Sequence, residues 1–439
     1  MKKLTLALGM CALTSMNLSY AQVRPNITTK KDFLRNYQAS DFKLRRLDVT
    51  ADFGTNGYSQ VNDDFFTFGE RSGISYFQFS NQAKYQGNFH IGLTSHFNYI
   101  NNNSEKSISN DVTLDSRTMN YFFFKNKWFI GIHNQAQIAH AYSKNPTNAV
   151  GRGWYLESYP MASIGYGRLE PVQYARNAMD IENQLRIGGR LDHELSENEL
   201  DRLADKLAVI NNVRYYDFRL RRIEIFEEID RQLDQMGAVT AHDVTYFAHL
   251  ADAYLYAQNF SRSSGFRHEF GLLGKFSNAL ASVEAGDYSR LNNGGFVAYN
   301  FRYDIPASYT VQHTFTAAAI GGMSTLRTEG IGAPAIVENQ GEAWANISYR
   351  LGLYPTTRTY FSLEAKVGNY LLDYGYSADL STTGQIYFSP RFRMEYNLGV
   401  AYGEGYQNHV FQYLAPGAQT VGDERFSFFG GLNFRYAIF

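Results

Sequence analysis

Residues 391–402 alternate between apolar and polar side chains with a period of two, which is typical of a β-strand whose two faces meet different surroundings. The apolar face holds Phe392, Met394, Tyr396, Leu398, Val400 and Tyr402, and the other holds Arg391, Arg393, Glu395, Asn397, Gly399 and Ala401. Strands of globular proteins usually have about five or six residues. A tilted strand that crosses a bilayer needs about 9–11. The length of this run therefore favours a membrane-spanning strand.

The start of the chain has the form of a secretory signal peptide over residues 1–21. A basic Met1-Lys2-Lys3 precedes a short apolar run, and Ala21 ends a small-x-small cleavage motif. The run is shorter than the roughly 20 residues of a transmembrane helix. The single cysteine, Cys11, lies inside it, so we expect neither disulfides nor thiolate metal sites in the mature chain. Residues 22–42 are polar without a clear period and are predicted to be a periplasmic lead-in.

The alternating pattern recurs along residues 43–168 and 259–439, for example where Phe89, Ile91 and Leu93 alternate with His90 and Thr94. Aromatic residues make up 16% of the chain. The pattern predicts a mainly β protein, a transmembrane antiparallel β-barrel of about 14–16 strands. We expect one strand over about residues 155–167 and a long polar loop over residues 101–111. The net charge of −1 gives no indication of nucleic-acid binding.

Residues 169–258 interrupt the strands with charged segments at helical spacing, which predicts an inserted α-helical subdomain. Ser196 and Glu199 form the signature of a capping box, and Gly237 is a stop signal for a further helix. Pro171 suits a first helical turn, and Thr240 suits the N-cap of the last helix. About six strands precede the insert. An even number returns the chain to the side where it began, so a periplasmic N-terminus predicts a periplasmic insert.

The signal peptide, the repeated amphipathic strands and the terminal aromatic Phe439 resemble those of Gram-negative outer-membrane β-barrels. Residues 166–172, Tyr-Gly-Arg-Leu-Glu-Pro-Val, and the charged helices after them resemble uncharacterised barrels of the Bacteroidota that carry a helical insert. By alternation, Phe439 falls on the face opposite Phe434 and Tyr436, which departs from the usual terminal assembly signal. The resemblance implies an outer-membrane location, with membrane lipid and the barrel-assembly machinery as partners.

The polar faces of the predicted strands supply candidate lumen-facing residues. They are His90, His96, His133, Arg302, Arg350, Glu364, Lys366, Arg391, Arg393 and Glu395. Buried charges must be paired or solvated, so their mixed signs suit either a wet channel or a lumen filled by salt bridges.

The insert holds a stretch dense in cations and aromatic rings. It is a candidate docking surface for a periplasmic or envelope protein, a surface for binding polyanions, or a plug element that contacts the lumen. Its residues are Arg214, Tyr215, Tyr216, Asp217, Arg219, Arg221 and Arg222. A helical hairpin with local charge pairs accounts for the same composition. We find no Gly-x-Ser-x-Gly motif, and His90 and His96 are too far apart along one strand for a metal clip. No catalytic residue, metal ligand or cofactor is predicted.

These features favour a non-enzymatic transport or export pore that the insert gates or supports. The alternative is a non-conducting barrel that anchors an envelope or secretion assembly. A weaker alternative is an outer-membrane enzyme that acts on lipid.

Overall fold

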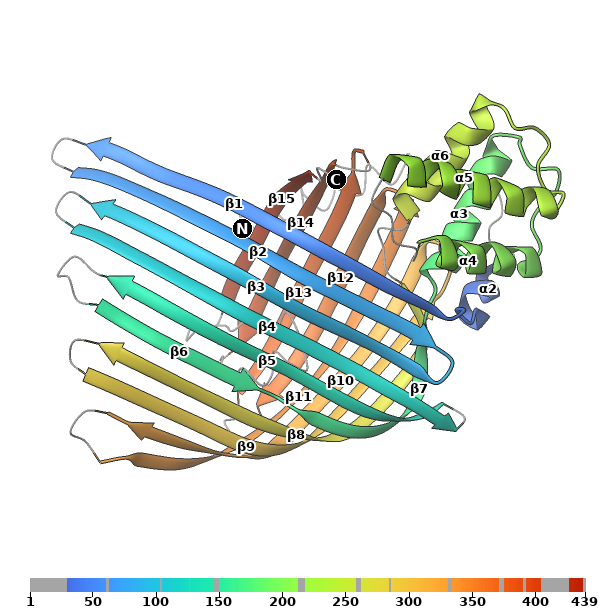
Figure 1. Cartoon of the computed structure of the whole chain (residues 1–439). Coiled ribbons are helices and arrows are strands. Elements are labelled where there is room, and N and C mark those ends of the chain that lie inside the picture. Colours follow the sequence, from blue (N-terminus) through green and yellow to red (C-terminus); the bar gives the residue numbers. More distant parts are fainter. Residues whose placement is uncertain are drawn as a thin grey trace.

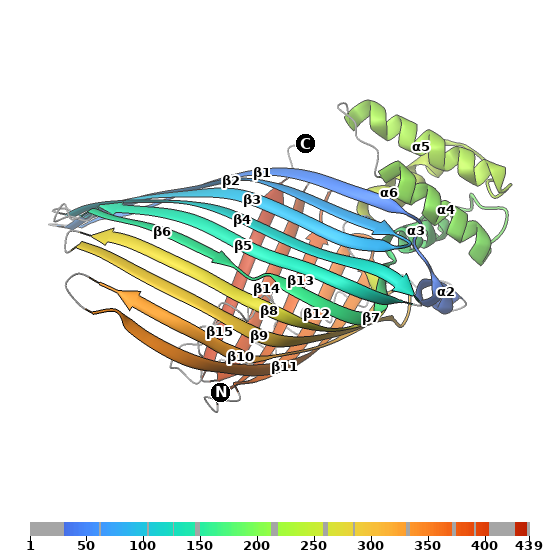
Figure 2. The ribbon, with the colours of Figure 1, turned by 60° about the horizontal axis from the view of Figure 1, so that its bottom comes forward.

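The computed structural model describes residues 30–60, 63–102, 105–125, 127–144, 150–211, 218–257, 262–283, 286–330, 334–370, 375–389, 392–403 and 426–436. One large antiparallel sheet curls into a β-barrel, and a cluster of helices lies at one of its ends (Figures 1 and 2). The predicted barrel of 14–16 strands with an inserted helical subdomain is confirmed. We call the end that carries the helices the helical end. Phe439 and Arg391 lie outside the described residues.

The first half of the barrel precedes the insert. Its strands are β1 (Phe42–Gln60), β2 (Asp63–Gln82), β3 (Tyr85–Asn102), β4 (Glu105–Lys125), β5 (Trp128–Lys144), β6 (Val150–Ser158) and β7 (Met161–Pro171). The second half comprises β8 (Ser263–Val283), β9 (Gly286–Pro306), β10 (Val311–Glu329), β11 (Ile336–Thr356), β12 (Thr359–Tyr370), β13 (Gly375–Tyr387), β14 (Phe392–Gly403) and β15 (Phe426–Tyr436). Consecutive strands pair with each other except β6 and β7, which both pair with β5 and β8, and β12–β15 pass behind the first strands in the views shown (Figures 1 and 2).

The strands β6 and β7 occupy one position in the sheet, because both pair with β5 on one side and β8 on the other. The single strand predicted over residues 155–167 is therefore interrupted. Pro160 has no N–H to give to a ladder, and prolines inside sheets are confined to edges and bulges. The break remains bonded to both neighbours, since the Tyr159 N–H donates to the Gln135 carbonyl (2.8 Å) and the Gly274 N–H to the Pro160 carbonyl (2.8 Å).

The long loop predicted over residues 101–111 is wrong. The strand β3 runs to Asn102 and β4 begins at Glu105, so the connection is short. Ile108 is an exposed apolar side chain in this stretch, whereas Asp111 lies on the other face and pairs with His96. Polar residues on both faces hid the strand from a hydrophobic pattern.

Within the described residues, four helices form the insert between β7 and β8, and a fifth precedes β1. They are α3 (Gln173–Ile187), α4 (Glu197–Asn211), α5 (Phe218–Gln235), α6 (Val244–Ala257) and α2 (Lys31–Asn36). Phe33, Leu34 and Tyr37 from the α2 segment join the insert's hydrophobic core, which includes Ile181 and Leu203. The N-terminal segment and the insert therefore share one core at the helical end. Among the described residues, no helix has the length and apolar character needed to cross a bilayer.

The helix ends follow the sequence in part. The Ser196 N–H donates to Glu199 Oε2 (2.8 Å) and the Glu199 N–H to Ser196 Oγ (3.4 Å), so the capping box is confirmed. Gly237 has φ +63°, just after α5, as a C-terminal stop requires. Two predictions are wrong. Pro171 ends β7, paired with Ser263, and Asp243 rather than Thr240 caps α6 by accepting the Tyr246 N–H (2.8 Å).

Candidate functional site: the barrel wall and its helical rim

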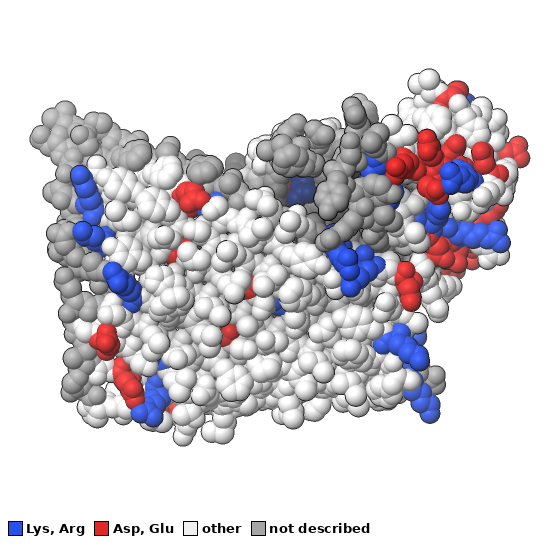
Figure 3. Space-filling view, in the orientation of Figure 1, with Lys and Arg blue, Asp and Glu red and all other residues white. Residues whose placement is uncertain are grey.

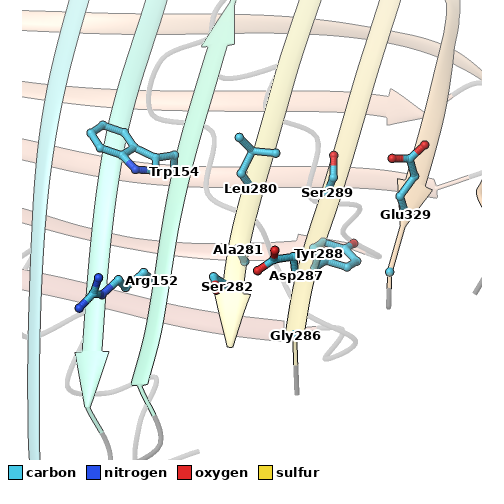
Figure 4. A pocket seen from close by; sticks show the side chains of 11 residues that line it. Arg152, Trp154, Leu280, Ala281, Ser282, Gly286, Asp287, Tyr288, Ser289 and Glu329 are labelled. Carbon is cyan, nitrogen blue, oxygen red and sulfur yellow. The ribbon is translucent and has the colours of Figure 1, made fainter. Parts of the chain in front are cut away.

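The outer face of the barrel is apolar. On β5, Trp128, Ile130 and Ile132 are exposed while the alternate residues Phe129 and His133 are buried. The middle of the visible surface carries few charges, and Lys, Arg, Asp and Glu gather over the helices and at the opposite rim (Figure 3). A hollow of about 770 Å³ lies at that opposite rim, between strands that carry Arg152, Trp154, Leu280, Asp287 and Glu329 (Figure 4).

Aromatic rings gather on the outer face at two levels. Near the helical end, Trp128 contacts Tyr166 (centroids 5.3 Å apart), Tyr166 contacts Phe266 (5.8 Å), and Phe266 contacts Tyr303 (6.4 Å). Toward the other end, the rings of His140 and Trp154 are 4.6 Å apart. Such girdles flank the apolar band of membrane barrels.

The spacing of the two levels fits a bilayer. The strand β5 carries Trp128 at one level and His140 at the other. At about 3.3 Å per residue this stretch is about 40 Å long, and a strand tilt of about 40° projects it to about 30 Å along the barrel axis. The hydrocarbon core of a bilayer is also about 30 Å thick.

The inner face carries ion pairs on β3 and β4. His90 Nδ1 lies 3.1 Å from Asp115 Oδ2, and His96 Nδ1 lies 3.3 Å from Asp111 Oδ2. Both histidines alternate with the exposed Leu93, so they lie on the face opposite the apolar one. Sequence analysis named the histidines but not the aspartates. The sequence pattern predicted only part of the strand that contains Asp111 and Asp115, so it gave no polar face on which to place them.

His133 lies in a buried polar cluster with Glu269 and Ser163. Glu269 is hydrogen-bonded to His133 Nε2, and Ser163 Oγ donates to Glu269 (2.6 Å). Ser163 Oγ also lies 3.5 Å from the same Nε2 atom. In a hydrolytic triad the carboxylate holds Nδ1 and leaves Nε2 for the serine proton. Here the carboxylate occupies the nitrogen that the serine would need, so this cluster is not built as such a triad.

Three arginine–carboxylate pairs lie on the inner face toward the helical end. Arg302 Nη2 lies 2.9 Å from Asp304, Arg350 Nη2 lies 2.6 Å from Glu364, and Arg393 Nε lies 2.7 Å from Glu395. Lys366 is in register with Asp379 on the neighbouring strand. Of the candidate lumen-facing residues, the structure therefore brings most together as pairs. Asp304 and Glu269 were not among the predicted residues, although each alternates with an outward-facing aromatic residue, Tyr303 and Phe270.

The helical rim joins the insert to turns of the barrel. Arg358 in the β11–β12 turn is paired with Asp252 of α6. Buried Arg176 of α3 and buried Arg262 both lie over the ring of Tyr354, at 4.9 Å and 4.6 Å. Arg262 also donates to the carbonyls of Tyr309 (2.6 Å) and Ser308 (3.0 Å). Burial, with neighbouring Arg176, lowers the pKa of Arg262 to about 10, so it stays charged at neutral pH.

The candidate docking surface is only partly visible. Arg214, Tyr215, Tyr216 and Asp217 lie outside the described residues, as does the side chain of Arg219. Arg221 was predicted to lie on this docking surface, but its guanidinium is buried. It donates to the Ile210 carbonyl near the end of α4. A cation near a helix C-terminus is favourable, and this residue therefore joins α4 to α5. Arg222 is half-buried.

One group of described residues has the composition of metal ligands. His242 Nε2 lies 3.2 Å from Asp230 and 2.9 Å from Asp234, and the ligand atoms of all three lie within 4.8 Å of one another. Tyr246 donates to Asp230 (2.7 Å). These contacts also describe an imidazole held between two carboxylates.

No family model and no curated protein matches the sequence. Solved structures with similar folds include the translocator domain of autotransporter NalP from Neisseria meningitidis (8% identity, 97% of this chain and 98% of that chain, TM-score 0.23). Others are the P. putida toluene transporter TodX (6%, 88% and 94%, TM-score 0.31) and the alcaligin outer-membrane receptor FauA from Bordetella pertussis (7%, 90% and 66%, TM-score 0.34).

Proposed function

We propose that this chain is an outer-membrane β-barrel that forms a transport or export pore, with the helical insert on its periplasmic mouth. The observation that carries the proposal is the exposure of ionisable side chains on the inner face. His90 and Asp115 are 36% and 41% exposed, and His96 and Asp111 are 42% and 44% exposed. Water reaches these groups, whereas a lumen filled with side chains would bury them.

The outer face supports placement in a membrane, because the apolar surface and the two aromatic levels match a bilayer in height. The predicted signal peptide over residues 1–21 supports export, and exported barrels of this size belong to the outer membrane. Periplasmic connections of such barrels are short. Apart from the insert itself, the strand ends that are separated by the most residues are Gly403 and Phe426, and Glu329 and Ile336, and these ends lie opposite the helices. The insert therefore faces the periplasm in this proposal.

The alternative of a non-conducting anchor draws on the surface of the insert. Acidic side chains gather over the helices (Figure 3), and the apolar Val209, Ile223 and Val244 are exposed there. A periplasmic protein with a complementary surface is the partner that this alternative requires.

The test is single-channel conductance of the full mature chain in planar bilayers. We expect discrete, stable channels from the pore. A barrel that is shown to be folded by its heat-modifiable gel mobility, but that stays silent, would exclude the pore and favour the anchor.

A second measurement separates a gate from a support. The mature chain has no cysteine, so Asp252→Cys with Arg358→Cys places two thiols across the rim contact, for bridging with a bis-maleimide. A gate that must move away from the rim would lose openings when it is bridged. A support would conduct equally before and after bridging. The unbridged double variant is the control. It lacks the Asp252–Arg358 ion pair just as the bridged protein does, so any difference between the two comes from the bridge.

A further inference from the structure

We infer that the pore presents cations to passing solutes at its helical end and therefore prefers anions, such as solutes that carry carboxylate or phosphate groups. The inference rests on the proposed pore function. The formal charges of the arginine–carboxylate pairs on the inner face cancel. The preference therefore comes from which member of each pair is more exposed to the lumen.

In each of the three pairs the arginine is more exposed than its acid. Arg302 is 46% exposed and Asp304 0%, Arg350 is 46% exposed and Glu364 24%, and Arg393 is 32% exposed and Glu395 16%. The carboxylates lie back against the wall while the guanidinium groups stand toward the water. A passing solute meets the exposed guanidinium groups at a shorter distance than the carboxylates behind them, so a balanced set of pairs still gives the lumen a positive face.

Hydrogen bonds hold the most buried acid in the wall. Asp304 accepts a hydrogen bond from Thr314 Oγ1 (2.7 Å), another from Ser263 Oγ and a third from Arg302 Nε (2.9 Å). Two of these donors are neutral wall hydroxyls, which satisfy the carboxylate without drawing it toward the lumen.

A fourth arginine stands beside the first pair. Arg267 of β8 is directly opposite Arg302 of β9 in the strand register, and its guanidinium lies 4.0 Å from the centre of the Tyr121 ring. Like charges directly opposite one another destabilise a sheet. An anion that passes between the two guanidinium groups would relieve this repulsion, because arginine forms strong charge-assisted hydrogen bonds to carboxylates and phosphates.

Among the side chains that the structure describes, the other acids of the inner face do not cancel this arrangement at the helical end. Glu269 is buried and hydrogen-bonded to His133 and Ser163, and Asp379 lies opposite Lys366. The exposed Asp111 and Asp115 each contact a histidine, and they lie on β4 away from its helical end.

The test is the reversal potential of the full mature chain in a KCl gradient. We expect chloride to be favoured over potassium by about threefold or more, since clefts of one sign concentrate the opposite ion. The double variant Arg350→Gln with Arg393→Gln should bring this ratio to unity or below. Arg302 is left intact, because its loss would strand the buried Asp304.

The matched control is Arg327→Gln. Arg327 is also paired with a glutamate, Glu329, but it shares the outer face with the exposed Leu291 and Val337. It should keep the wild-type ratio. Channels that favour potassium, or a ratio that the double variant leaves unchanged, would overturn the anion preference and leave the pore standing. Silence from a folded barrel would instead reject the pore itself, and the anion preference with it.

Discussion

Asp243 holds two parts of the insert at once. Its carboxylate accepts hydrogen bonds from the Tyr246 N–H (2.8 Å), at the start of α6, and from Arg190 Nη2 (2.6 Å), in the chain after α3. The hydrogen bond from Arg190, followed by the one from the backbone of Tyr246, lowers the pKa of Asp243 from 3.8 to about 2.

This shift predicts a pH dependence. A carboxyl whose pKa is lowered by folding contributes stability above its unfolded pKa, and loses that contribution as the pH falls through its folded pKa. We therefore expect the cap to hold at pH 4 and to be lost between about pH 4 and pH 2. Carbon-13 NMR of labelled Asp carboxyls should show a midpoint near 2, which Arg190→Gln raises toward 3.8. The control Arg186→Gln, which breaks a pair with Glu194 instead, should leave the midpoint in place.

The N-caps of α4 and α6 show how far single residues predict where a helix begins. Ser196 and Glu199 carry a two-residue signature that fixes the helix start, and the structure has it. Thr240 and Asp243 both have suitable side chains, so the choice between them depends on the position of Arg190, which is remote in sequence. The exposure difference between Arg302 and Asp304 depends on Thr314 of another strand and has no local signal at all.

Leu34 of α2 tests whether this helix is held in place by the hydrophobic core of the insert. It is fully buried in the insert core, although it precedes β1 in the chain. Leu34→Ala should cost about 2–5 kcal/mol, because it removes buried methyl groups and leaves a cavity. We expect faster tryptic cleavage after Arg35 in the folded barrel. Asn36→Ala, at an exposed position of the same helix, should cleave at the wild-type rate, and equal cleavage of both variants would show that α2 is not held by this core.

Elements were predictable where one face was apolar. The alternation in β3 and β14 located those strands, and the helical spacing located the insert. The α2 helix was missed because its six residues are too few to show a period. The start of β4 was missed because polar residues occur on both of its faces. The β6–β7 break was missed because Pro160 lies within a longer run that was predicted to be one strand.

The three tryptophans test the placement of the whole barrel. Trp128 and Trp154 are exposed on the outer face at the two aromatic levels, while Trp344 is buried among inward-facing apolar side chains. Versions that retain one tryptophan each, with Phe at the other two sites, should differ in bilayers with brominated lipids. We expect bromine near the headgroups to quench Trp128 and Trp154 more than bromine near the chain ends. Trp344 is the internal control, and strong quenching of it would place the inner face in contact with lipid.

At the scale of the molecule, the sequence predicts the barrel and its approximate strand number, since each strand carries its own pattern. The arrangement of the inner wall follows from strand register, which pairs residues as remote as His133 and Glu269. A pattern read one strand at a time contains no such information.

The core shared by α2 and the insert has a consequence for how the chain folds. It links residues on either side of strands β1–β7, so it closes the first half of the barrel into a loop of chain. Closing so long a loop lowers the entropy of the chain, and this cost is offset only when the long-range contacts of the shared core have formed. Once this loop is closed, the chain segments before β1 and after β7 are held together by the shared core. The amides of β1–β7 should then exchange hydrogen with similar opening free energies, as one cooperative unit. The later strands lie outside this loop.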